Sequence, residues 1–379
     1  MSDIQITEVT DKALLKRFIL VQKTLYKDDP QFIPPLMIER LEAFSKDKNP
    51  YFEHAEAAYF LATRDGQDVG RISAQVDQLA LQQFGDGLGH FGCFEADSQE
   101  TANALLDTAR LWLKERGMTR MQGPWDLSAN EQCGMLVDGF DTPPVFMMNH
   151  GKPAYDGYAK AWGLAKVKDM YSYANDTRGD RSEKIQKIIQ MGKRNKNLTL
   201  RQINMKDWDN EIRLIMDIFN DAWSGNWGYV PFTENEVAHA AKALKAVVKP
   251  WRTYVAEYKG EPAAFMLTIP DVNHFIRDLD GSLLPFGWAK LVYRLFISKH
   301  EPRHRVPLLG IRKKFHGKPI GGIMAMWMIE ESRVNVVEHG SSFGDMGWIL
   351  EDNMAIRNMI EAEIGEIYKT YRIYEKAIN

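Results

Sequence analysis

The sequence has few cysteines, little net charge and no long apolar run. Only Cys93 and Cys133 occur among its 379 residues, which excludes a disulfide scaffold and indicates a reducing compartment. The formal net charge of −3 gives no reason to expect a polyanionic partner such as nucleic acid. No apolar run approaches the roughly 18 residues that a membrane-spanning helix needs, and residues 1–6 do not resemble a signal peptide. The sequence therefore predicts a cytoplasmic protein.

Metal chemistry and a cysteine nucleophile are also not expected. His300 and His304 have the spacing of a metal-binding pair on a helix, but Pro302 lies between them and no third ligand is evident. Cys133 has no recognisable histidine partner, so a small packed thiol explains this residue better.

Length and element pattern predict two domains. A chain of 379 residues with 45% apolar residues is long enough to bury two cores. Each half shows the same predicted order of two helices, a hairpin, a strand, a helix, a strand and a helix. The hairpins turn at residues 65–66 and 259–260, and the last helix is predicted over residues 354–368. Residues 172–182, a polar and glycine-bearing stretch between the halves, are the predicted boundary.

Residues 305–331 predict a site for a phosphorylated ligand. They read as a short apolar strand over 306–311, a basic loop with glycines, and an amphipathic helix. The first turn of a helix has N–H groups without intrahelical acceptors, and its dipole favours an anion there. Glycines let the backbone approach a phosphate, and lysines add positive charge. These residues are Gly317, Gly321, Gly322, Lys313, Lys314 and Lys318.

The segment from His316 to Gly321 resembles the pyrophosphate loop of the GNAT superfamily of acyl-CoA-dependent N-acyltransferases. His316 stands where that loop usually has Gln or Arg. Pro319 replaces the usual first glycine, which removes one N–H donor. The corresponding stretch of the first half, residues 95–100, is acidic and lacks glycine. Because acidic side chains would repel a pyrophosphate, we expect only the second half to bind CoA.

Across nearly its whole length the chain is similar to a bacterial tandem-GNAT family, the bacterial ceramide synthase family. The sequence motifs that carry this resemblance lie at residues 49–54, 130–141, 223–228, 348–353 and 368–376. The resemblance implies an α/β (α+β) fold of two GNAT-like domains in tandem, each a mixed, mostly antiparallel sheet flanked by helices. Residues 1–174 would form a degenerate domain without a pyrophosphate loop. Residues 183–379 would form the acyl-CoA-binding domain, with an insertion at about 272–304.

The resemblance also implies an activity. A long-chain acyl group would move from acyl-CoA, the co-substrate, to the amine of a sphingoid-type base, and no metal would be needed. Two alternatives stay open, an acetyltransferase of a small polar amine and a non-catalytic acyl-CoA-binding or regulatory protein. The second alternative is supported by His316 and Pro319, and by Ile360, which stands where many GNAT enzymes have a tyrosine as acid. Tyr368 and Tyr371 are candidate substitutes for that tyrosine.

Individual roles follow from the same resemblance. The cofactor-binding residues would be Leu309, Gly310, Ile311, His316, Gly317, Lys318, Ile320, Gly321, Gly322 and Asn353. The candidate catalytic residues are Glu351, Asp352 and Glu131, with Glu338, His339 and Asp345 as further groups near the same strand. The substrate-binding residues would be Asn130, Trp223, Asn226 and Trp227. A capping or solvated role is the alternative for each carboxylate, and a core position is the alternative for both tryptophans.

The insertion contains an amphipathic stretch, residues 287–299. Its apolar stripe consists of Trp288, Leu291, Val292, Leu295 and Phe296. The basic residues Lys290, Arg294 and Lys299 lie mostly off that stripe. A basic amphipathic helix of this kind is typical of a membrane interface. We therefore expect a peripheral contact with the inner membrane surface, and the alternative is that the stripe packs on the domain.

Overall fold

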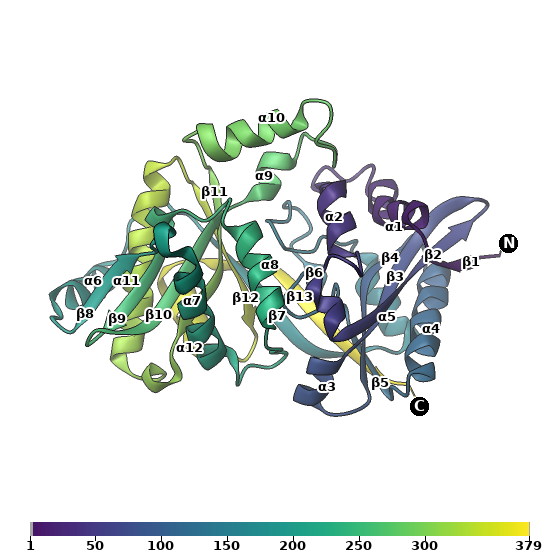
Figure 1. The fold of residues 1–379 in the computed structure, drawn as a ribbon, viewed down its shortest axis with the longest axis horizontal. Coiled ribbons are helices and arrows are strands. Elements are labelled where there is room, and N and C mark those ends of the chain that lie inside the picture. The colour runs from purple at the N-terminus through teal and green to yellow at the C-terminus, as the bar shows by residue number, and fades with distance from the viewer. Residues whose placement is uncertain (1–2, 379) are drawn as a thin grey trace. The chain divides into compact units, whose positions relative to one another are not determined.

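The chain forms two compact units in a computed structural model that describes residues 3–378 (Figure 1). Unit 1 contains residues 3–170, 276–288 and 369–378, and unit 2 contains residues 171–275 and 289–368. Part of the insertion and the end of the chain thus belong to unit 1. The assignment of residues 1–174 to a degenerate domain and of residues 183–379 to the acyl-CoA-binding domain stays a prediction.

Unit 1 is built on a mixed sheet whose last strand comes from the end of the chain. The strands lie in the order β1 (Gln5–Glu8), β2 (Ala55–Arg64), β3 (Gln67–Asp77), β4 (Leu88–Ala96), β5 (Arg120–Gly123) and β13 (Glu366–Ala377), and β6 (Met135–Asp138) also pairs with β13. The β4–β5 pair is parallel, and the other described pairs of this unit are antiparallel.

Helices cover both faces of the unit 1 sheet. They are α1 (Lys12–Leu25), α2 (Met37–Ala43), α3 (Gln78–Phe84), α4 (Gln99–Glu115) and α5 (Ala154–Trp162), with a short 3-10 turn at Pro50–Glu53. Side chains alternate along β2, so Tyr59 and Leu61 pack in the core beneath α1, while Phe60 and Ala62 pack in the core beneath α4.

Unit 2 is built on a second mixed sheet. Its strands lie in the order β7 (Ala165–Asn175, from Tyr171 onward), β12 (Phe343–Leu350), β11 (Arg303–Ile311), β10 (Glu261–Pro270), β9 (Thr253–Tyr258) and β8 (Leu198–Gln202). The β11–β12 pair is parallel, and the pairs from β8 to β11 are antiparallel.

The unit 2 sheet also lies between helices. They are α6 (Glu183–Arg194), α7 (Trp208–Trp223), α8 (Glu234–Leu244), α11 (Pro319–Glu338) and α12 (Met354–Glu363), with short turns at Met205–Asp207, Pro250–Arg252 and Lys313–Phe315. Ala264 and Met266 of β10 pack with α6 and α11, and the intervening Phe265 faces Trp223 of α7. The insertion forms α9 (Val272–Ile276), α10 (Gly287–Val292) and a π-helical turn at Tyr293–Ile297. No helix in residues 3–378 is both long and apolar enough to span a bilayer.

Both predicted hairpin turns are confirmed. Asp65 and Gly66 have φ of 51° and 76°, and Lys259 and Gly260 have φ of 56° and 80°. Positive φ at both central residues is the signature of the turn that suits two twisted antiparallel strands.

The predicted last helix is wrong in its last third. Helix α12 ends at Glu363, and residues 366–377, including Tyr368 and Tyr371, form strand β13. A Cβ on Gly365 would lie 2.2 Å from the carbonyl oxygen of Ala174, so the chain passes directly against β7 there. The segment that follows is rich in tyrosine and isoleucine, which favour strands.

Candidate functional site

Strand β11 loses contact with β12 partway along its length. The parallel ladder runs from Arg303 to Val306, which lies opposite Met346. At that point β11 has a bulge, because Val306 and Pro307 together lie opposite the single residue Thr268 of β10. A bulge bends its strand and ends regular pairing. Residues 307–311 therefore continue beside β10 alone, and their other edge is open.

The open edge presents backbone groups of alternate residues. The Arg312 N–H donates to the carbonyl of Ala263 at 2.9 Å, and hydrogen-bonded pairs alternate with non-bonded pairs in an antiparallel ladder. Leu309 and Ile311 therefore turn their N–H and C=O groups away from β10. The ring Nε2 of His316 lies 2.7 Å from the Ile311 carbonyl oxygen, which places His316 at the end of this edge.

The loop after β11 leads to a helix N-terminus without a side-chain cap. Lys318 is the N-cap residue of α11, and its side chain makes no capping hydrogen bond. Pro319 has no N–H, and the Gly321 N–H donates to the Lys318 carbonyl at 3.0 Å. The Ile320 N–H has no acceptor within the helix. Since residues 316–319 are exposed, this N-terminus is open to an anionic ligand.

The two glycines of the first turn are not equivalent. A Cβ on Gly321 would lie 2.6 Å from the carbonyl oxygen of Phe315, so Gly321 is needed for the loop to pack against the helix. A Cβ on Gly322 would meet nothing within 4 Å. Gly317 has a φ of 68°, a conformation that favours glycine.

Side-chain contacts hold two of the three lysines that were predicted to face a phosphate. The Lys313 side-chain Nζ donates to the Ser224 hydroxyl at 2.7 Å, while its backbone N–H donates to the Asp221 carboxylate at 2.7 Å. Lys314 forms an ion pair with Glu261 at 2.8 Å. Lys318 forms no ion pair within the part of the chain that the structure describes, so it is the lysine best placed to contact a ligand.

The end of α7 packs on the open strand. A Cβ on Gly310 would lie 2.6 Å from the rings of both Trp223 and Phe265, so only glycine fits between them. The Asn226 N–H donates to the Trp223 carbonyl at 2.7 Å, and Asn226 and Trp227 are both half-buried. The structure thus brings Trp223 to the predicted cofactor strand, while contact of Asn226 or Trp227 with a substrate stays a prediction.

The predicted catalytic carboxylates of unit 2 follow β12. Glu351 is half-buried and Asp352 is exposed. The Asn353 side chain caps α12, as the N-cap alternative predicted, and its role in cofactor binding stays a prediction. Ile360 is buried in the core of unit 2, and its hydrocarbon side chain has no proton to donate to the leaving thiolate.

Two other predicted groups lie far from the loop. Glu338 and His339 are at the C-terminal end of the 20-residue helix α11, about 30 Å from its N-terminus at 1.5 Å per residue. The His339 ring stacks on Trp251 at 3.8 Å between centroids. Neither residue can act at the loop.

A buried ion pair lies where β11 and β12 separate, and it joins Asp345, a predicted candidate group, to Arg305, which the sequence did not single out. Asp345 is fully buried and lies opposite Arg305, whose Nε is 3.4 Å from Asp345 Oδ1. The hydroxyl groups of Ser172 and Tyr368 donate to Oδ2, that of Tyr368 at 2.8 Å. Burial raises the pKa of Asp345, and Arg305 opposes the rise. The available signal was that Asp345 is the only charged residue in β12.

Unit 1 repeats the bulge without the open helix end. Cys93 and Phe94 of β4 lie opposite the single residue Ile72 of β3. The following helix α4 is capped, because Ser98 Oγ accepts from the Thr101 N–H at 3.3 Å. A side chain therefore already occupies the position that an anion would need. This contrast favours CoA binding in unit 2, as predicted from the two loops.

The remaining predicted residues belong to unit 1. Asn130 and Glu131 are half-buried in the loop between β5 and β6. Glu95, the first residue of the acidic stretch, points inward and accepts hydrogen bonds from Tyr26 and Tyr155, each at 2.7 Å. Among residues 3–378, no three His, Cys, Asp or Glu side chains are placed to hold a metal ion.

Comparison of the whole sequence with known proteins decides the family. The chain is 43% identical over 380 residues to the protein named bacterial ceramide synthase from Caulobacter vibrioides, covering 100% of this chain and 98% of the relative. The chain belongs to the bacterial ceramide synthase family. It is also 41% identical over 366 residues to protein YghO of Escherichia coli, covering 96% and 93% of the two chains. The predicted family resemblance is confirmed, although no general protein-family model matches the sequence.

Solved structures share the fold of this ceramide synthase family member. The tandem GNAT protein of the clavulanic acid biosynthesis pathway superimposes with a TM-score of 0.59 at 10% identity, covering 100% of this chain and 99% of that one. A GCN5-related N-acetyltransferase from Sphaerobacter thermophilus gives 0.55 at 10% identity, covering 99% and 96%. The predicted tandem GNAT-like fold is confirmed. Family and fold together identify an acyl-CoA-dependent N-acyltransferase.

Proposed function

We propose that the protein transfers a long-chain acyl group from acyl-CoA to the amine of a sphingoid-type base. The observation that carries this proposal is the 43% identity over the whole chain to the Caulobacter protein named bacterial ceramide synthase. The open edge of β11 and the uncapped N-terminus of α11 support the proposal. The strand edge can donate hydrogen bonds to the pantetheine arm and the thioester of an acyl-CoA, and the helix N-terminus can bind its pyrophosphate.

The donor would lie along β11 and over the start of α11. Its pyrophosphate would accept the Ile320 N–H and approach the exposed Gly322 and Lys318. Its pantetheine arm would form hydrogen bonds with the open edge of β11, beyond the end of the β11–β12 ladder, where Leu309 and Ile311 present their N–H groups. One of these groups would donate to the thioester oxygen as it gains negative charge.

The reaction needs a neutral amine and a stabilised oxyanion. The amine nitrogen forms a bond to the thioester carbon, the C–S bond then breaks, and CoA leaves as a thiolate that takes up a proton. The amine must lose protons to a base. Asp345 is favoured over the exposed Asp352, because its raised pKa and its hydrogen bonds to Tyr368 and Ser172 suit it to hold a proton. Asp345 is fully buried, so it would act through those hydroxyls as a positioning residue.

Purified protein offered a matrix of acyl-CoA chain lengths and amines tests the proposal. Free thiol release and mass spectrometry of the product should show the highest kcat/KM for a long-chain acyl-CoA with a long-chain base. Preference for acetyl-CoA with a small polar amine would support the acetyltransferase alternative. Tight CoA binding without turnover of any amine would support a non-catalytic protein.

A membrane contact through residues 287–299 is a further part of the proposal. Trp288, Val292, Tyr293, Phe296 and Ile297 are exposed in this segment, and Lys290 and Lys299 are exposed beside them. Aromatic burial and attraction to anionic lipid would together hold the segment in the interface. In co-sedimentation with anionic liposomes, a Trp288→Ser/Phe296→Ser variant should bind less than wild type. Equal binding of the two folded proteins would refute the contact.

A further inference from the structure

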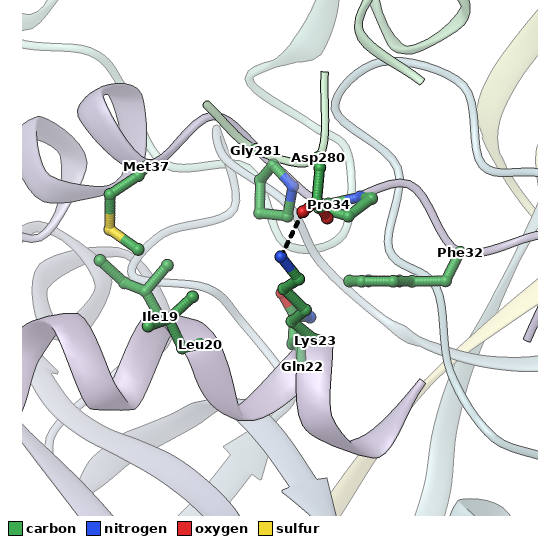
Figure 2. Close-up of a pocket in the computed structure, with 10 residues that line it drawn as sticks. Ile19, Leu20, Gln22, Lys23, Phe32, Pro34, Met37, Asp280 and Gly281 are labelled. Atoms are coloured by element: carbon green, nitrogen blue, oxygen red, sulfur yellow. Dashed lines mark hydrogen bonds and ion pairs between the residues drawn. The ribbon is translucent and has the colours of Figure 1, made fainter. Parts of the chain in front are cut away.

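A strap formed by residues 276–288 crosses the surface of unit 1 above α1. Figure 2 shows Lys23 reaching from α1 to Asp280 of the strap, with Phe32 and Pro34 beside it. Lys23 Nζ lies 2.5 Å from Asp280 Oδ2. The Met37 N–H donates to the carbonyl of Gly281 at 3.0 Å. A Cβ on Gly281 would lie 2.9 Å from the Pro35 carbonyl oxygen, so the strap rests directly on backbone.

The surface beneath the strap is mainly apolar. A cavity of about 30 Å³ lies there, and its apolar lining comes from Ile19, Leu20, Phe32, Pro34, Pro35 and Met37. This volume is enough for about one water molecule but far below the roughly 150 Å³ of a cavity that holds benzene. A larger ligand would therefore fit only if the strap moved.

The strap is anchored at its start, where Ile276 and Leu279 are buried, and the side-chain contacts at its surface are weak. The Lys23 and Asp280 side chains are 47% and 67% exposed, and exposed ion pairs contribute little to stability. The Arg277 guanidinium donates to the Pro30 carbonyl at 2.9 Å, also at the surface. The far end of the strap is strongly apolar, since Leu284, Phe286 and Trp288 are 78%, 73% and 53% exposed. The part of the strap after Leu279 is therefore weakly held and has an apolar tip, which suits it to move aside for an apolar ligand.

We propose that the apolar surface beneath the strap is a binding site for the unbranched alkyl chain of a long-chain substrate. The strap moves outward to admit the chain, and Leu284, Phe286 and Trp288 cover it from outside. This inference rests on the proposed function, since it needs a substrate with a long alkyl chain. Either the amine or the acyl-CoA could supply that chain, and the test has an arm for each.

The first measurement is photolabelling with a diazirine near the end of an alkyl chain, carried by a long-chain amine in one arm and by a long-chain acyl-CoA in the other. We expect peptides within residues 16–37 to be labelled in one arm, and competition by the unlabelled substrate. No labelling there in either arm would overturn the site, whether or not the protein has acyltransferase activity.

The second measurement locks the strap. A Lys23→Cys/Asp280→Cys protein is joined by a short bismaleimide and compared with the same protein left unjoined. The native Cys93 and Cys133 are buried, so the reagent reacts at the introduced pair. A matched control joins Glu183→Cys and Lys187→Cys, an exposed ion pair on α6.

Locking the strap should abolish the labelling and lower kcat/KM for the long-chain substrate of the labelled arm at least tenfold. Turnover of its short-chain analogue should stay within twofold, and the control should change neither. An equal loss for long and short chains, or no loss for either, would overturn the proposal. If wild type turns over no long-chain amine or acyl-CoA, the proposed function fails instead, and the labelling result still decides the site.

Discussion

The anion site at α11 makes a prediction in which stability and ligand affinity change in opposite directions. We consider Gly322→Asp, which puts a carboxylate in the first turn of the helix. A Cβ at this position meets nothing within 4 Å, so the side chain fits without a clash. A negative charge near a helix N-terminus stabilises the helix by about 0.3–1 kcal/mol, and the loss of glycine adds a few tenths. The ligand-free protein should therefore become slightly more stable.

The same carboxylate should weaken binding of CoA. Two like charges about 4 Å apart repel by roughly 1 kcal/mol in bulk water and about 4 kcal/mol near a protein surface. Because Gly322 is exposed, we expect a value below the upper limit, about 1.4–2.8 kcal/mol, which is a tenfold to hundredfold rise in Kd. Added salt should reduce the difference, because it screens exposed charges.

Calorimetric titration with CoA and thermal unfolding without ligand together measure both effects. Gly322→Asn is the matched control, since it has the same shape without the charge and should lower the affinity far less. Gly321→Asp would be a poor test, because its Cβ would lie 2.6 Å from the Phe315 carbonyl oxygen and would disturb the loop itself. If Gly322→Asp and Gly322→Asn bind CoA equally well in folded protein, the pyrophosphate does not lie at this helix end.

Three further predictions concern other parts of the chain. Asn226→Ala should raise KM for the amine and leave CoA affinity unchanged; unaltered kinetics would remove Asn226 from the acceptor pocket. Asp345→Asn should abolish the fall of kcat on the acidic side of the pH profile, and Tyr368→Phe should shift the pH at which that fall occurs. If Asp345 had a purely structural role, neither substitution would change that pH. Burial lowers the pKa of His90 to about 4, so the unfolded state binds the extra proton and stability should fall as the pH drops from about 6.5 to 4, by roughly 1.4 kcal/mol per pH unit. Urea unfolding of His90→Asn should show a smaller fall than that of the exposed control His239→Asn.

Features set by short-range chemistry could be predicted from the sequence. Residues 65–66 and 259–260 carry their turn geometry in their own residue types. The strand, loop and helix around Gly321 follow one another directly along the chain, so periodicity and glycine positions were enough to find them. Asp11 likewise caps α1, accepting from the N–H groups of Ala13 and Leu14, and this too is local.

Features that depend on distant partners could not be predicted in the same way. Strand β13 has the composition of a strand, but its partners β5 and β6 lie more than 200 residues earlier, and the local pattern after Met354 favoured a longer helix. Arg305 and Asp345 meet only because β11 and β12 are parallel and in one register. Asp345 could be named as a candidate from its place in β12, but its pairing with Arg305 could not be predicted before the order of the strands was known.

The position of β13 has a consequence for how the protein is made. Residues 369–377 complete the sheet of unit 1, although most of that sheet is translated first. During synthesis, β5 and β6 must therefore wait for the last strand to leave the ribosome, with hydrogen-bonding edges exposed to other chains. The unit that is translated first is thus completed last. A fragment that ends near residue 170 would lack β13, and a short deletion at the C-terminus would damage the N-terminal unit.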